Sequence, residues 1–521
     1  MVPLLRAESR DLQRVDVPIF TARVGGETIF DSRLNAIGGV IAESGLTVVR
    51  QIIERLSERD LDRQSWLVRG CLATLDLAET GLESRPRLAL DVGRAPAPRD
   101  SFLAAADGVA AELANLAYED SSRASWYAFE YLEHPHWTLR YADPSLYEGV
   151  CGIALFLAYH GAVRRDARST RLARGAVTAL LKGLDRAQEQ TPQIGVFAGQ
   201  GGWIYTFVHL ARVWRDADLL DRAEGLVPAV LPRIAEDEVC DLVGGSAGLL
   251  IALLELARER PSGRIWEAAR ACGDHLLDAA RPQARGVGWP LEVAGGSALL
   301  GFSHGTAGIA WALLRLHERT GDRRYRETAL EALAYERSLF DEERGNWPDL
   351  RAGERPECRA EDASGTHYLT AWCHGAPGIL LARALSLPYL GGDSEVRREI
   401  ERALETTLAE GFETGHCLCH GALGNIDILL VVSRLLDLPK LEEKARQLAS
   451  AVLGHQSEAG WHYGVPGKMT PPGLMVGLAG FGYQMLRLAE PQRLPSVLAL
   501  ESPPSRDGAR RLVDGSAFPQ Q

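Results

Sequence analysis

Seven copies of a glycine motif, G-x-x-G, divide most of this chain into segments of similar length. The steps between the first glycines are 50, 46, 60, 70, 46 and 56 residues. Most copies are followed by a run such as residues 153–158 or 309–314, which is apolar on almost every face and predicts a buried helix. The seven pairs are Gly149/Gly152, Gly199/Gly202, Gly245/Gly248, Gly305/Gly308, Gly375/Gly378, Gly421/Gly424 and Gly477/Gly480.

Amphipathic segments lie between the glycine motifs. Apolar residues at i, i+4, i+7 and i+8 form one face of each segment, with charged residues between them. Two such sets are Tyr325, Ala329, Ala332, Leu333 and Val396, Ile400, Ala403, Leu404. One buried and one amphipathic helix per period of about 50 residues predict a helical-hairpin repeat. We therefore predict an all-α fold, an α/α toroid (double α-barrel) of seven helical hairpins from roughly residue 104 to 491, after a short, mainly helical N-terminal segment.

The glycines have two physical explanations. They give the backbone freedom to turn into the next helix, and they allow close backbone approach where the inner helices converge. For most of the fourteen glycines a purely steric role is the better interpretation. A phosphate-binding loop is a poor alternative because the sequence lacks G-x-x-x-x-G-K-[ST].

Composition excludes several classes of protein. The formal net charge of -12 and the pI of about 5.6 argue against binding to nucleic acid or to an anionic membrane. The apolar runs are too short for a transmembrane segment. Eight cysteines in 521 residues are sparse for a disulfide framework, so we expect a protein of the reducing cytoplasm.

The ends of the chain differ from the repeats. Residues 1–80 contain no chemical motif of their own, and 81–103 are rich in proline and mixed charge, which predicts a linker. We expect a repeat domain over 104–500 and a disordered tail over 501–521.

Three of the seven turns contain residues that can bind metal or transfer protons: Cys373 and His374 in one, Cys419 and His420 in the next, and His304 in a third. In a closed ring, equivalent turns lie at one end of the central cavity. Two thiolates and one imidazole suit Zn²⁺ and leave a fourth position open for substrate. We predict Cys373, Cys419 and His420 as zinc ligands, with His374 as a competitor for the histidine position. A closed four-ligand structural site and a set of buried core residues remain alternatives.

An open zinc ion of this kind would lower the pKa of a bound thiol and make it a nucleophile. His304 is then placed to act as general acid or base. Asp241, before the third glycine pair, has two equally good interpretations: it orients a histidine, or it caps the following helix.

These motifs together resemble the lanthionine cyclase (LanC-like) family. The residues 372–378, 419–421 and 303–305 carry the resemblance, and the stretches 143–149, 346–351 and 473–480 resemble the class II, LanM-type subgroup in particular. The resemblance implies a double α-barrel around zinc, with Cys373, Cys419 and His420 as ligands, His304 as acid/base and Asp241 in cyclisation. The implied reaction joins a cysteine of a dehydrated lanthipeptide precursor peptide to dehydroalanine or dehydrobutyrine.

Two departures and one further resemblance qualify this expectation. Stand-alone cyclases have a tyrosine and an arginine where this chain has His374 and the pair Leu369-Thr370, so the roles of those two residues do not transfer. Residues 1–80 resemble the C-terminal end of the class II dehydratase domain and lack its catalytic motifs. We therefore expect no dehydratase activity in this chain. We expect the chain to be a fragment, a split gene product or a truncated reading frame of a class II synthetase. A separate dehydratase half remains open as a second partner.

Other classes remain as alternatives. An α/α glycoside hydrolase would need paired carboxylates in these turns, where the chain has cysteine and histidine. A zinc thiol transferase of the prenyltransferase type and a non-catalytic LanC-like scaffold that binds zinc or peptide are the nearer rivals.

Overall fold

The computed structural model describes residues 2–80, 88, 90–93, 95–133, 136–291, 295–351, 366–391, 393–463 and 469–503. They fall into two compact units, Met1–Val68 and Arg69–Gln521, and each unit is described by itself. The expected tail lies outside the described residues from 504 onward, as does the start of the expected linker at 81–87.

The first unit contains helix α1 (Val2–Leu12), a three-stranded antiparallel sheet, helix α2 (Gly45–Arg55) and the start of helix α3 (Glu58–Thr80). The sheet strands are β1 (Thr21–Ala22), β2 (Ile29–Phe30) and β3 (Ala36–Ile37). Among the described residues of this unit, the buried hydrophobic side chains are Ala7 and Ile37. Many large apolar side chains are exposed instead, including Val15, Val17, Val24, Leu34, Ile53, Leu56 and Leu61. This unit therefore has almost no hydrophobic core of its own.

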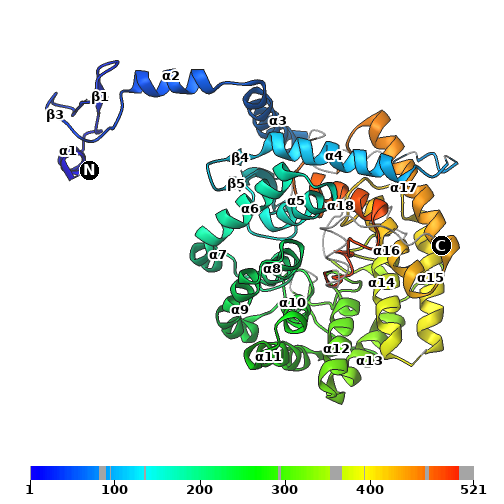
Figure 1. Cartoon of the computed structure of the whole chain (residues 1–521). Helices are drawn as coiled ribbons and strands as arrows, with labels where there is room; N and C mark the ends of the chain where they lie inside the picture. The colour runs from blue at the N-terminus through cyan, green and yellow to red at the C-terminus, as the bar shows by residue number, and fades with distance from the viewer. Residues whose placement is uncertain are drawn as a thin grey trace. The chain divides into compact units, whose positions relative to one another are not determined.

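The second unit is a double ring of helices, as predicted (Figure 1). In the described part of the chain, the inner helices are α5 (Val150–Arg164), α8 (Gly201–Trp214), α10 (Ser246–Glu259), α12 (Thr306–Thr320), α14 (Ala376–Ser386), α16 (Ala422–Leu435) and α18 (Leu478–Ala489). Around them lie α6 (Ala167–Lys182), α9 (Asp218–Val230), α11 (Gly263–Ala279), α13 (Arg323–Ser338), α15 (Ser394–Glu410), α17 (Pro439–Ala459) and α4 (Arg99–Leu116).

Shorter elements connect the helices of this unit. They are β4 (Tyr118–Glu119), β5 (Ala124–Ser125), β6 (Tyr127–Glu133), β7 (His136–Tyr141), α7 (Leu184–Gln190), η1 (Leu231–Glu236), β8 (Arg281–Pro282), β9 (Val287–Gly288), β10 (Pro348–Asp349), β11 (His367–Tyr368) and η3 (Leu387–Tyr389). Each of the strands pairs antiparallel with a neighbour in a two-stranded sheet. Among the described residues, no helix is both long enough and apolar enough to cross a bilayer.

The pattern of apolar residues explains which helices lie inside. Inner helix α12 buries residues on all its faces, whereas outer helix α13 buries Tyr325, Ala329, Ala332 and Leu333, the face that its periodicity predicted. Polar caps delimit the outer helices: the Asp322 side chain accepts a hydrogen bond from a backbone N–H at the start of α13. One face of each outer helix thus stays in water while the other covers the inner ring.

The ring is closed by its first and last helices in the sequence. Six inner helices pack against the outer helix that follows them, but the partner of α18 is α4, which precedes all the others. Figure 1 shows α4 lying along α18, and an ion pair between Arg99 and Glu490 joins them. The seventh helix pair is therefore formed between segments far apart in the sequence rather than as a hairpin.

Close approach within the turn explains the second glycine of each motif. A Cβ atom on Gly152 would lie 2.4 Å from the carbonyl oxygen of Leu146, and one on Gly248 would lie 2.0 Å from that of Leu242. The same clash, with the carbonyl six residues earlier, occurs at Gly202, Gly308, Gly378, Gly424 and Gly480. Backbone freedom matters at the first glycine only in the fifth motif, where Gly375 has φ +82°.

Hydrogen bonds join neighbouring turns around the ring. Leu242 N donates to Ser303 O (3.2 Å), Ser303 Oγ donates to Cys373 O (3.2 Å), and Cys419 N donates to Met475 O (3.0 Å). The remaining turns are joined by backbone bonds between Tyr147 and Phe197, Val196 and Leu242, and Met475 and Tyr147. The turns therefore form one connected layer at an end of the ring.

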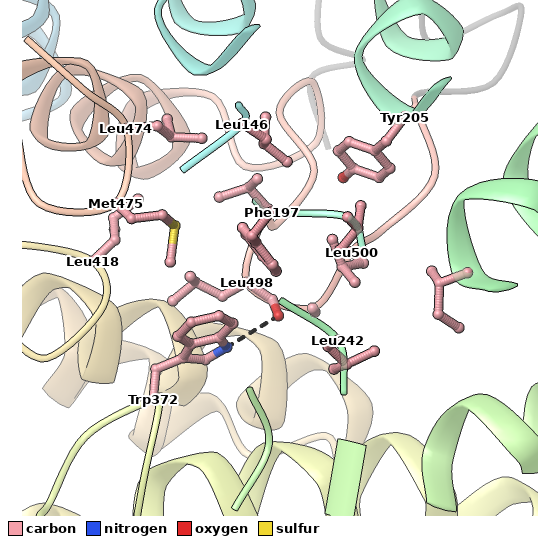
Figure 2. Packing of buried hydrophobic residues seen from close by; sticks show 14 of the residues in the cluster. Leu146, Phe197, Tyr205, Leu242, Trp372, Leu418, Leu474, Met475, Leu498 and Leu500 are labelled. Carbon is pink, nitrogen blue, oxygen red and sulfur yellow. Dashed lines mark hydrogen bonds between the residues drawn. The ribbon is translucent and has the colours of Figure 1, made fainter. Parts of the chain in front are cut away.

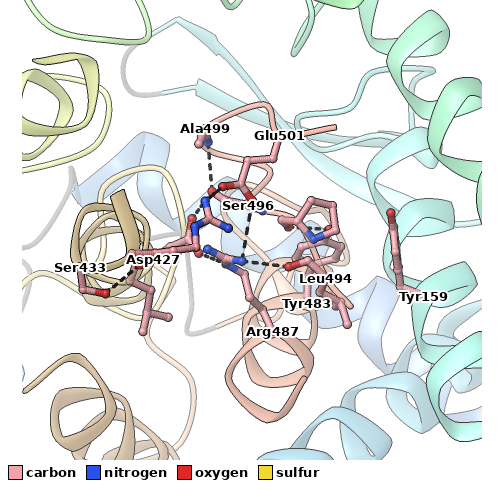
Figure 3. Close-up of polar contacts among 12 residues, drawn as sticks. Tyr159, Asp427, Ser433, Tyr483, Arg487, Leu494, Ser496, Ala499 and Glu501 are labelled. Atoms are coloured by element: carbon pink, nitrogen blue, oxygen red, sulfur yellow. Dashed lines mark hydrogen bonds and ion pairs between the residues drawn. The ribbon is translucent and has the colours of Figure 1, made fainter. Parts of the chain in front are cut away.

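The segment after α18 fills the centre of the ring beneath this layer. Leu498 and Leu500 are fully buried among side chains of the turns, and Trp372 Nε1 donates to Leu498 O at 3.2 Å (Figure 2). A buried polar network holds the segment in place: Arg487 pairs with Asp427 and donates to Leu494 O at 2.9 Å (Figure 3). Side chains of this segment thus lie in the middle of the barrel, packed against the turns.

Candidate metal and catalytic site

Three consecutive turns carry four of the predicted site residues, His304, Cys373, Cys419 and His420, at one end of the ring. These turns precede α12, α14 and α16, which are neighbours in the inner ring. The turn with His304 packs directly on the turn with Cys373, because a Cβ on Gly301 would lie 3.0 Å from Cys373 O. Gly301 has φ +98°, a conformation that only glycine adopts without strain.

The two cysteines are close enough to change each other's pKa. Cys373 and Cys419 are both buried. Interaction with Cys419 lowers the pKa of the Cys373 thiol against the effect of burial, while interaction with Cys373 and burial together raise the pKa of Cys419. Tyr147, from the first turn of the ring, lies near Cys419, and burial and this thiol raise the pKa of its hydroxyl.

The two histidines that follow the cysteines occupy different surroundings. His420 is half-buried with its Nε2 atom buried, and Thr414 Oγ1 donates to its backbone carbonyl at 2.8 Å. His374 is buried, and its ring stacks on that of His304 with 5.7 Å between centroids. Its Nδ1 atom lies 4.0 Å from the carboxylate of Asp349. His374 is therefore a neighbour of both the His304 turn and an acidic residue.

Asp241 contacts a histidine and its own turn, but it does not cap α10, whose N-cap residue Gly245 has no side-chain cap hydrogen bond. Its Oδ2 atom is 2.8 Å from His304 Nδ1, and its Oδ1 atom accepts a 2.7 Å hydrogen bond from Gly244 N in the turn before α10. Burial lowers the pKa of His304, but the hydrogen bond to Asp241 and the charges of Asp241 and Cys373 outweigh it, so the pKa is raised. About a third of the His304 side chain is exposed, whereas Asp241 is buried.

Asp349 and Arg351 are site residues that sequence reasoning missed. Arg351 donates from Nε and Nη2 to the Asp349 carboxylate at 2.6–3.1 Å. Burial raises the pKa of Asp349, but Arg351 and His374 more than offset this, and the pKa falls to about 2. The positive charge of Arg351 acts on both Cys373 and His304. In the sequence these residues showed only as part of the LanM-like stretch, and no spacing rule connects them to the cysteines.

A second set of metal-binding side chains lies near Asp241. Among the described residues, Asp237, Cys240 and His275 have donor atoms that all lie within 4.8 Å of one another. These atoms already have partners: the Asp237 carboxylate accepts 2.6 Å bonds from Ser246 N and Oγ, and His275 Nε2 is 2.8 Å from Asp237 O. Burial and the charge of Asp237 raise the pKa of Cys240, so this thiol stays protonated. The hydrogen bonds of this set hold the loop before α10.

The donor types of the three turns suit a zinc ion. Two neighbouring thiols, one of them with a lowered pKa, and the imidazole that follows Cys419 are ligands of the kinds that zinc prefers. Among the described residues, however, the donor atoms that all lie within 4.8 Å of one another are those of Asp237, Cys240 and His275.

Comparison with known families identifies the class of protein. Residues 141–499 match the family model described as lanthionine synthetase C-like protein. The match covers more than half of the chain, and the chain therefore belongs to this family. The structure is also similar to nisin cyclase, with a TM-score of 0.51 and 18% sequence identity over 72% of this chain and 94% of that protein, which shows the shared fold.

Two relatives place the chain more closely within the family. The lacticin 481/lactococcin biosynthesis protein LcnDR2 of Lactococcus lactis subsp. lactis is 21% identical over 93% of this chain and 50% of its own length. Glutathione S-transferase LANCL1 of Danio rerio is 30% identical over 24% of this chain and 30% of its own length. The chain thus spans about half the length of LcnDR2, a LanM-type relative.

Proposed function

We propose that this chain is a zinc-dependent lanthionine cyclase that closes thioether rings in a lanthipeptide precursor. The observation that carries the proposal is the placement of two buried cysteines, Cys373 and Cys419, on neighbouring turns next to the turn of His304, which pairs with Asp241. A family match over residues 141–499 supports the same reaction class.

Cys373, Cys419 and His420 would hold the zinc ion. When bound there, zinc supplies a Lewis acid that lowers the pKa of a substrate thiol. His374 stands apart from this set because it stacks on His304 and faces Asp349, which favours three protein ligands over four. The site then keeps one position for the cysteine of the peptide.

His304 is the residue that we propose for proton transfer. Addition of the substrate sulfur to the β-carbon of a dehydro residue moves the C=C electron pair toward the amide carbonyl. The α-carbon then needs one proton, in exchange for the proton that the thiol has lost. Because Asp241 engages Nδ1 of His304, Nε2 is the atom that exchanges a proton with the substrate.

The substrate that fits this chemistry is a peptide that is already dehydrated. Dehydration would come from a domain or a separate polypeptide outside this chain, because residues 1–80 show no phosphate-binding or catalytic loop. The reaction also needs reduced cysteines, in agreement with the seven free thiols in the described residues and with our placement in the cytoplasm.

The test uses a synthetic peptide that contains one dehydroalanine and one cysteine, without ATP. Ring formation conserves mass, so free thiols are counted by alkylation, against buffer and zinc-stripped protein as controls. We expect faster thiol loss with the intact chain, and a rate lower by ~10²–10⁴ for His304→Asn with zinc retained. Thiol loss no faster than in buffer would contradict the proposal and favour a binding scaffold.

A competing thiol separates this function from that of another relative. The zebrafish relative carries the name glutathione S-transferase. If the site is a cyclase, glutathione added to the same peptide should remain unconsumed while the internal ring forms. Preferential formation of a glutathione adduct would assign the site to transfer of a small thiol instead of cyclisation.

A further inference from the structure

Arg351 and Asp349 form a charged pair that is built onto the turn of Cys373. Strand β10 pairs with β11, which places Asp349 opposite His367, just before that turn. The Asn346 side chain fixes the same junction: its Nδ2 atom donates to Leu369 O at 3.1 Å, and its Oδ1 atom accepts from Ala376 N at 2.8 Å. The pair is therefore held in position by two sets of bonds to the turn.

The two members of the pair differ in exposure. The Asp349 side chain is fully buried, whereas 21% of the Arg351 side chain is exposed. Asp349 binds the guanidinium through both carboxylate oxygens, which restricts it to one plane. Arg351 is thus the part of this pair that a substrate can reach, and it is already oriented.

The position of the guanidinium matches a need of the proposed reaction. Asp349, which holds the guanidinium, lies 4.0 Å from Nδ1 of His374, and the His374 ring stacks on that of His304 with 5.7 Å between centroids. When sulfur adds to the β-carbon, negative charge moves onto the carbonyl oxygen of the dehydro residue until the α-carbon is protonated. A fixed cation beside that oxygen lowers the barrier because it needs no reorganisation during the reaction.

We propose that Arg351 binds the carbonyl oxygen of the dehydro residue and stabilises the enolate that forms on addition of the thiolate, with Asp349 as its positioning residue. This inference rests on the proposed cyclase function. In the step, the S–Cβ bond forms, the C=C electron pair becomes an enolate, and the carbonyl is restored when Cα accepts a proton. One proton leaves the thiol and one reaches Cα, so the step is balanced.

A purely structural role for Arg351 makes a different prediction. If Arg351 only neutralised buried Asp349, its removal would lower the melting temperature and affect all functions of the site together. If it binds the reacting carbonyl, its removal lowers kcat with little change in zinc content or in the melting temperature.

The chain contains a matched control pair. Asp322 and Arg324 have the same Asp-x-Arg spacing, and Arg324 donates from Nε and Nη2 to both carboxylate oxygens of Asp322 at 2.7–3.3 Å. This pair lies at the exposed start of α13, and its arginine side chain is 62% exposed. Arg324→Gln therefore removes the same kind of interaction away from the site.

The experiment measures cyclisation of the dehydroalanine–cysteine peptide by wild type, Arg351→Gln and Arg324→Gln, together with zinc content and melting temperature. We expect Arg351→Gln to lower kcat by roughly 10²–10³-fold with zinc retained, and Arg324→Gln to match wild type. Millimolar guanidinium should restore part of the rate of Arg351→Ala, which a structural role does not predict.

The outcomes separate the two proposals. Active wild type with an equally active, folded Arg351→Gln overturns the role of Arg351 alone. Inactive wild type overturns the cyclase function and this inference with it. If Arg351→Gln does not fold, Arg351→Lys decides: a rate equal to wild type overturns the role, and a reduced kcat with an unchanged melting temperature supports it.

Discussion

At the scale of single residues, the site combines groups from five of the seven turns. Tyr147, Asp241, His304, Cys373 and Cys419 each come from a different turn, and hydrogen bonds between turns fix their separations. Each residue is thus positioned by an inner helix on one side and by the neighbouring turn on the other. Such rigid support suits a reaction that depends on the distance between a thiol and an acceptor.

Zinc binding should depend on the cysteine pair and not on the Asp237 cluster. We expect Cys373→Ala with Cys419→Ala to abolish the one zinc ion per chain, because both soft ligands are lost. Cys240→Ala is the matched control, since Cys240 is also a buried cysteine in a turn of the ring. Elemental analysis of purified protein measures the difference. Zinc retained by the double variant, or lost in Cys240→Ala, would move the assignment to the other set.

The Asp241 carboxylate should control the pH dependence of cyclisation. It raises the pKa of His304, so Asp241→Asn lowers that pKa. A histidine that delivers a proton is active below its pKa, and activity is lost as pH rises through it. We therefore expect the alkaline limb of the kcat profile to move to lower pH in Asp241→Asn, and to stay in place in Asp322→Asn. An unmoved limb in Asp241→Asn would show that His304 does not deliver the proton.

At the scale of elements, the turn and its inner helix form one unit with a steric requirement. The second glycine of each motif lies inside the inner helix, against the carbonyl of a residue six positions earlier in the turn. The chain reverses within a few residues and brings the functional side chains at its tip close to the helix axis. A larger residue would push the tip away from the helix.

A pair of glycine-to-alanine substitutions tests this requirement. A Cβ added to Gly152 in α5 would meet a carbonyl oxygen at 2.4 Å, whereas one added to Gly225 in α9 would meet nothing within 4 Å. We expect Gly152→Ala to destabilise the protein by ~1–3 kcal/mol through overpacking. Gly225→Ala should stabilise it by ~0.5–1 kcal/mol, since alanine favours helix. Urea denaturation gives both values, and equal effects would refute the steric account.

The sequence predicted these elements well because their signals are local. Glycine spacing and apolar periodicity led to the inner and outer helices, and the shared register of Cys373 and Cys419 led to their grouping. Tyr147 stands in the same register, two residues before the first glycine of its motif, so the repeat also contained the signal for it. Arg351 could not be predicted in this way, because it reaches the site through a strand pairing that leaves no periodic signal in the sequence.

At the scale of the whole molecule, the two units differ in how much core they contain. The ring buries its inner helices almost completely, whereas the first unit buries Ala7 and Ile37 among its described hydrophobic residues. Local stability follows the amount of buried apolar surface. The free energy of local unfolding should therefore be lower for the first unit than for the ring.

Limited proteolysis of the full chain should show this difference. We expect cleavage within residues 2–68 at protease concentrations that leave the ring intact, because the first unit has few buried contacts to hold its backbone closed. Intact-mass measurement over time identifies the cut sites. Simultaneous loss of both units would show that they are equally stable in solution.

The pairing of α4 with α18 also sets the order in which the molecule can be completed during synthesis. Arg99 and Glu490, which join these helices, are 391 residues apart. At ~5–20 residues per second, α4 waits roughly 20–80 s on the ribosome before its partner exists. During that time its buried face, with Phe102 and Leu113, is open to other apolar surfaces. Nascent chains of this protein should therefore be substrates for chaperones that bind exposed apolar segments.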